Sequence, residues 1–215
     1  MGALNGALIH CTGINFFVLT LASGGMLRGI SLMITDGKPI TKFGKAFMQL
    51  GIGRIGEFQF PVLFALTLIL LSSPLMFHVK WGNYVQALGG SETALKRSGV
   101  RTGFYRISVH VFLGITAAVT AVIITARLNS AEPNAGMNME LDAITAVIMG
   151  RTPIRGGNAS IAGTVLAVLI LGIIRNGLTL LSVSSDFQQW VTGFLLLASV
   201  LISEIRVWNT RALIK

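Results

Sequence analysis

The chain has 215 residues, of which 53% are hydrophobic and only 12% are charged, and its mean hydropathy is +0.74. Such a composition excludes an ordinary soluble domain. The net charge of +9 would indicate a nucleic-acid partner in a polar protein, but the Lys and Arg excess of cytoplasmic membrane loops explains it better, and no nucleic-acid partner is expected.

Five apolar runs of about 20 residues, the length that crosses a bilayer, follow one another along the chain. They are Ile14–Ile34, Phe58–Phe77, Ile107–Ala126, Gly156–Ile174 and Phe187–Ser203. Before them, Met1–Ile9 lacks the basic start of a signal peptide and resembles the inside of a membrane helix. The apolar run Ala143–Gly150 is too short to span and predicts a broken or re-entrant helix. The predicted fold is an all-α polytopic membrane helix bundle of about five spans plus this short helix.

Loop charges give the orientation. The loop 80–106 has five basic residues against one acidic residue, whereas 127–142 has one basic residue against three acidic ones. The positive-inside rule therefore places 80–106 and the basic C-terminal tail in the cytoplasm and 127–142 outside. The basic loop 36–57 conflicts with this rule, because it must lie outside if Phe58–Phe77 crosses once.

The segment 87–99, ALGGSETALKRSG, has the composition of a short helix. Ser91 suits the N-cap, Glu92 the first turn, and Lys96 and Arg97 the last turn, while Gly99 suits the left-handed position after the helix. Gly89 and Gly90 permit a sharp turn before it. The alternative is a solvated basic loop that only obeys the positive-inside rule.

No catalytic or metal-binding residues are predicted. The chain has no Walker A sequence, no spacing typical of a nucleophilic triad, and three histidines without metal-ligand spacing. Its one cysteine, Cys11, excludes an internal disulfide. Glu140 and Asp142 are two residues apart, so they do not face each other, and they suit the N-terminus of the broken helix.

Two long segments resemble one family. HVKWGNYVQALGGSETALKRSGV is similar to the cytoplasmic loop of ABC-transporter permeases of the ribose-type monosaccharide importers, and ARLNSAEPNAGMNMELDAITAVIMG is similar to their ARL…ELDAIAAVVLGG segment. GTVLAVLILGIIRNGLTLLSVSSDFQQWVTG and LNGALI extend the resemblance over nearly the whole chain. The residues of the first segment that match the family pattern are Gly82, Tyr84, Ala87, Gly89, Gly90, Ala94, Ser98 and Gly99.

The resemblance implies the transmembrane subunit of an ATP-driven importer of a ribose-, pentose- or hexose-like monosaccharide in the bacterial inner membrane, and not an enzyme. It implies one permease domain over 1–215, with the ATPase-coupling helix in the loop 87–100. The implied partners are a cytoplasmic ABC ATPase, which uses ATP and Mg²⁺, a periplasmic sugar-binding protein, a second permease subunit and membrane lipid. The implied coupling residues are Gly89, Gly90, Ser91, Ala94, Lys96, Arg97, Ser98 and Gly99.

A further expectation concerns the substrate path. Asn15, Phe16 and Phe17 combine a polar group with aromatic rings, a surface that suits sugar, although packing is the preferred explanation.

Two departures from the family leave alternatives open. Family permeases carry further helices before the position of Met1, so we expect a truncated product, a wrongly assigned start or a degenerate gene. Arg151 and Arg155 stand where the family has small residues, which puts transport in question. The alternative functions are a secondary transporter or channel that needs no ATPase, and a permease fragment that does not transport.

Overall fold

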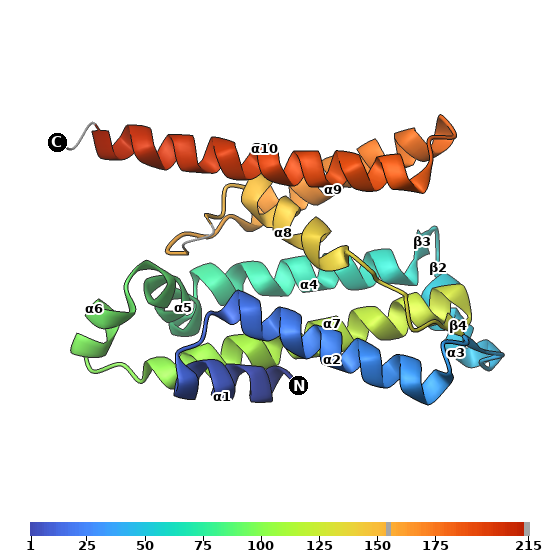
Figure 1. Cartoon of the computed structure of the whole chain (residues 1–215), viewed down its shortest axis with the longest axis horizontal. Helices are drawn as coiled ribbons and strands as arrows, with labels where there is room; N and C mark the ends of the chain where they lie inside the picture. Colours follow the sequence, from blue (N-terminus) through green and yellow to red (C-terminus); the bar gives the residue numbers. More distant parts are fainter. Residues whose placement is uncertain (154–155, 213–215) are drawn as a thin grey trace. The chain divides into compact units, whose positions relative to one another are not determined.

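The computed structural model describes residues 1–153 and 156–212, which are almost entirely helical (Figure 1). The helices are α1 (Gly2–Thr12), α2 (Phe16–Thr35), α3 (Lys45–Ile52), α4 (Phe60–Phe77), α5 (Lys80–Gly90), α6 (Glu92–Arg97), α7 (Thr102–Leu128), α8 (Met139–Met149), α9 (Ile161–Leu180) and α10 (Ser185–Ala212). Four two-residue strands accompany them: β1 (Ile40–Thr41), β2 (Arg54–Ile55), β3 (Phe58–Gln59) and β4 (Ser130–Ala131).

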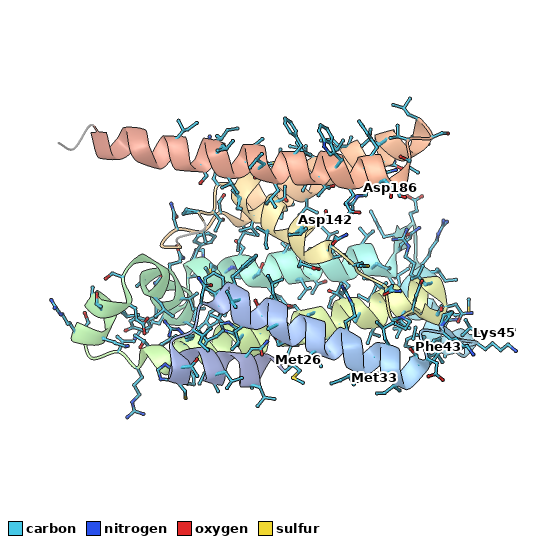
Figure 2. The ribbon with its side chains drawn as sticks, in the orientation of Figure 1. Met26, Met33, Phe43, Lys45, Asp142 and Asp186 are labelled. Carbon is cyan, nitrogen blue, oxygen red and sulfur yellow. The ribbon has the colours of Figure 1, made fainter. Side chains whose placement is uncertain are left out.

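Within the described residues, four helices are long and apolar enough to cross a membrane, namely α2, α4, α7 and α9. Their apolar side chains are exposed: Met26 and Met33 on α2 are 70% and 72% accessible (Figure 2). A soluble protein would bury such helices, so this surface is one that lipid covers. The fifth predicted run lies in α10, a continuous helix of 28 residues. The prediction of an all-α polytopic membrane protein is confirmed.

The helices α1, α8 and α9 agree in part with the predictions from the sequence. The first residues form α1, as their apolar composition predicted. The broken helix is α8, whose 11 residues extend about 16 Å, roughly half of the hydrocarbon thickness. Helix α9 differs from its prediction: it begins at Ile161 rather than Gly156 and continues past Arg175 to Leu180.

Contacts divide the chain into two compact units, which are described separately. The first comprises Met1–Val85 and Glu92–Gly136, and the second comprises Gln86–Ser91 with the chain from Met137 onwards. Helix α5 contributes to both units, because its last residues group with the second.

In the first unit, α1 and α3 pack on α7. A Cβ atom on Gly6 would lie 2.9 Å from the Cα of Ile107, and one on Gly51 would overlap the backbone of Ala126 and Arg127. Glycine at these positions lets the helix backbones approach closely, which drives association where lipid removes the hydrophobic effect.

The same unit joins two loops that are distant in sequence. Strand β1 pairs antiparallel with β4, with Ile40 opposite Ala131 and Thr41 opposite Ser130. The loops 36–57 and 127–142 therefore lie at the same membrane face. This pairing supports the side of the membrane that a single crossing by α4 requires for the loop 36–57, although the loop is positively charged.

In the second unit, α8 packs against α9 and α10. The backbones of α8 and α9 meet at Gly150, where a Cβ atom would overlap Gly163 and Thr164. Ser160 caps α9 by accepting a hydrogen bond from the Gly163 backbone N–H at 3.2 Å. These contacts pack the C-terminal end of α8 against the first turn of α9.

Candidate functional site

Helix α6 forms where the sequence predicted it. It spans Glu92–Arg97, directly after Ser91, with Glu92 in the first turn and both basic residues in the last. Gly99 follows in the left-handed conformation with φ 77°. The Val100 N–H donates to the Leu95 carbonyl at 3.4 Å and the Gly99 N–H to the Lys96 carbonyl at 3.0 Å, so the end of the helix is closed by its own backbone.

Gly89 and Gly90, which permit a sharp turn, do not form one themselves. Both residues are the last residues of α5, and neither has a positive φ. Their lack of a side chain serves close packing instead. A Cβ atom on Gly89 would lie 2.7 Å from the backbone nitrogen of Gly157, and one on Gly156 would lie 2.8 Å from the Cα of Gly89.

Glu92 fixes α6 to α7. Its carboxylate pairs with Lys96 one turn later, at 3.0 Å, and with Arg106 on α7, and it accepts a hydrogen bond from the buried Thr102 hydroxyl at 3.4 Å. The Lys96 hydrogen bond, with help from Arg106, lowers the pKa of Glu92 below its ordinary value. Together with the buried side chain of Leu95, these contacts hold α6 in one orientation on α7.

The remaining residues of α6 are exposed. The exposed residues of this surface, which we term the α6 face, are Thr93, Ala94, Lys96, Arg97, Ser98 and Gly99. They include five of the eight predicted coupling residues, Ala94, Lys96, Arg97, Ser98 and Gly99, with Thr93 in addition. A small, positively charged helical knob of this kind suits a complementary groove in a partner protein.

The other three predicted coupling residues are not part of the α6 face, because Gly89 and Gly90 end α5 and Ser91 joins the two helices.

Helix α5 is also held on α7. The Trp81 indole N–H donates to the Ser108 hydroxyl at 2.9 Å, and the rings of Tyr84 and Tyr105 lie 5.1 Å apart. Helix α7 is a candidate membrane span of 27 residues, about 40 Å long. Both α5 and α6 therefore pack against a membrane helix. A force applied to α6 therefore acts on a membrane helix.

The predicted substrate-path residues lie at the start of α2. Asn15 is the N-cap, and its side-chain oxygen accepts a hydrogen bond from the Phe17 N–H at 2.9 Å. Phe16 and Phe17 are both exposed. Their role in a sugar path stays a prediction.

The structure describes one of the two arginines that depart from the family pattern. Arg151 is exposed and has φ 70°, so its side chain is not enclosed by the protein. Arg155 lies outside the described residues. Within residues 1–153 and 156–212, no group of three His, Cys, Asp or Glu side chains could hold a metal ion.

Sequence reasoning missed a polar cluster in the second unit. Asp142 on α8 (Figure 2) pairs with Arg175 on α9, with 2.8 Å between Oδ1 and Nη2. The two side chains border a cavity of about 320 Å³ between α8, α9 and α10. Their separation in sequence hides the pair, and Arg175 was placed just beyond the end of an apolar run.

Comparison with known proteins identifies relatives along nearly the full chain. The ribose import permease protein RbsC of Escherichia coli is 37% identical over 206 residues, which cover 94% of this chain and 64% of that protein. The Bacillus subtilis ribose import permease is 37% identical over 92% of this chain and 62% of its own length. The D-allose transport system permease protein of Escherichia coli is 35% identical, over 95% and 63% respectively.

The chain spans less than two thirds of the length of these relatives. No solved structure gives a significant match. The family described as the permease component of branched-chain amino acid transport systems matches residues 1–200. Because this match covers most of the chain and agrees with the membrane helices, the protein belongs to that permease family, and the resemblance to ribose-type permeases is confirmed.

Proposed function

We propose that this chain is the transmembrane subunit of an ATP-driven importer for a monosaccharide in the bacterial inner membrane. The observation that carries the proposal is the α6 face, a rigid, basic and exposed helix held on a membrane span by Glu92 and Arg106. The names of the relatives, which include ribose and D-allose permeases, support a sugar as the cargo.

The proposal requires three protein partners. A cytoplasmic ABC ATPase binds the α6 face and supplies ATP hydrolysis with Mg²⁺, a periplasmic protein delivers the sugar, and a second permease subunit completes the path. The chain itself binds no cofactor in this scheme.

Movement passes from the ATPase to the membrane helices through two contacts. The ion pair of Glu92 with Arg106 transmits a displacement of α6 to α7. The packing of Gly89 against Gly156 and Gly157 transmits a displacement of α5 to the turn before α9. Close-packed backbones move together because a gap between them would forfeit their dispersion contacts.

Substitution of Ala94 tests the proposal. The chain is produced with the sugar ABC ATPase and the sugar-binding protein of the same organism, and ATPase co-purification and uptake of labelled D-ribose, D-allose and L-arabinose are measured. We expect Ala94→Phe to lower both at least tenfold, because the bulky ring prevents α6 from seating in a groove.

Ala135→Phe is the matched control, since Ala135 is also exposed but lies in the loop 127–142. It should leave ATPase co-purification unchanged. Normal co-purification and uptake with Ala94→Phe would overturn the proposal. Uptake by the wild-type chain without any ATPase would instead favour a secondary transporter.

A further inference from the structure

The cavity of the second unit has the composition of a ligand site. Its volume of about 320 Å³ lies at the lower end of the usual range for small-molecule pockets, roughly 300–1,000 Å³. Its walls are mainly apolar, and four polar side chains border it, from three helices. These are Asp142 on α8, Arg175 on α9, and Gln188 and Thr192 on α10.

Arg175 is a charge within a candidate membrane span. Such a charge is costly in lipid, faces the interior of a bundle or a water-filled cavity, and marks a functional site by default. Here Asp142 neutralises it at 2.8 Å, and the Thr192 hydroxyl lies 3.5 Å from the same nitrogen. The pair is not sealed in protein, since the side chains of Arg175 and Asp142 are 53% and 26% accessible.

The pair keeps hydrogen-bonding capacity for a ligand. Both contacts of the guanidinium use Nη2, and the carboxylate contact uses Oδ1. Among the described residues, Nη1 and Nε of Arg175 and Oδ2 of Asp142 have no hydrogen-bond partner. Neighbouring donors and an acceptor of this kind match adjacent hydroxyl groups, each of which both donates and accepts.

The charges select against ions. Because Asp142 and Arg175 compensate each other, an anion would meet the carboxylate and a cation would meet the guanidinium. Gln188 donates its amide N–H groups to Thr179 at 3.3 Å and to the Val183 carbonyl at 3.1 Å, which leaves its side-chain oxygen as a further acceptor. A neutral molecule with several hydroxyl groups satisfies all of these groups.

We propose that this cavity binds a neutral aldose and that Asp142 and Arg175 hold adjacent hydroxyl groups of the sugar. The inference rests on the proposed function, because it gives the carried sugar a binding site on this chain. The apolar walls, which include Ala143, Ala146 and Gly172, face the C–H surface of the ring.

Direct binding to the full chain in lipid nanodiscs tests the site. Saturation-transfer NMR is recorded with D-ribose, D-allose and L-arabinose in turn, for the wild type and for Asp142→Asn/Arg175→Gln. The double variant removes both charges, so it leaves no unpaired charge behind and should fold and melt like the wild type. We expect it to bind at least tenfold more weakly.

Glu140→Gln is the matched control, because Glu140 is an exposed carboxylate of the same helix that does not line the cavity. It should bind like the wild type. Absence of binding of all three aldoses to the wild type, or equal binding by the double variant, would overturn the site. ATPase-dependent uptake in proteoliposomes of the same chain tests the function separately, so the site can fail while the function stands.

Discussion

Gly156 lies against Gly89, so closely that a Cβ atom on Gly156 would be 2.8 Å from the Cα of Gly89. Gly156 and Gly157 both have positive φ, 79° and 89°, which only glycine adopts without strain. The contact joins the turn before α9 to the end of α5, and both parts belong to the second unit.

Gly89→Ala should therefore destabilise the protein. The added methyl group has no room beside the Gly157 nitrogen, and overpacking of this kind costs about 1–3 kcal/mol. Thermal unfolding in nanodiscs measures the change. Gly177→Ala is the control, because nothing lies within 4 Å of a Cβ atom at that helical position. A stability of Gly89→Ala equal to that of the control would contradict the contact.

Glu92→Gln should weaken the attachment of α6 in a pH-dependent manner. The pairs with Lys96 and Arg106 lower the pKa of Glu92 in the folded state, so their stabilisation is complete above the pKa of the unfolded state. It is lost as the pH falls through the folded-state pKa. We expect a loss of about 1 kcal/mol at neutral pH that disappears in acid.

Melting curves of wild type and Glu92→Gln at neutral and acidic pH measure this difference. Glu57→Gln serves as the control, because Glu57 is exposed and forms no ion pair with the described residues. A wild-type advantage that persists unchanged in acid would rule out the carboxylate as its source.

A disulfide should form between Ile40→Cys and Ala131→Cys in a Cys11→Ser background. The two residues are register partners in the β1–β4 ladder, where cross-strand distances suit a disulfide. Thr41→Cys with Ala131→Cys is one residue out of register, so the side chains point to opposite faces and should not link. Equal cross-linking of both pairs, measured by gel mobility after oxidation, would disprove the register.

Single cysteines should report the orientation. In the Cys11→Ser background, Lys38→Cys and Asn134→Cys should react with a membrane-impermeant thiol reagent from outside intact cells. Lys96→Cys and Asn158→Cys should react only after the membrane is opened, because their loops carry the positive charge. Labelling of Lys38→Cys and Asn134→Cys from opposite sides would conflict with the pairing of β1 and β4.

Sequence predicted the parts of this protein that depend on local interactions. The ends of α6 follow from Glu92, Lys96 and Gly99, each of which acts within one helical turn. The apolar runs predicted the membrane helices because lipid demands continuous hydrophobic length.

Long-range contacts account for what sequence reasoning missed. A Gly-Gly pair permits a turn, but Gly89 and Gly90 end a helix, and the Gly156–Gly157 backbone lies where a side chain on Gly89 would be. Likewise, α9 continues through Arg175 because Asp142 compensates its charge from another helix. Neither partner can be identified from spacing in one sequence.

The division of α5 between the two units has a consequence for biosynthesis. Residues Gln86–Ser91 group with the chain from Met137 onwards, although the ribosome makes them much earlier. Domains generally form in the order of synthesis, from the N-terminus. The packing of the end of α5 is therefore complete only after Gly156 and Gly157 have been synthesised, late in the translation of the chain.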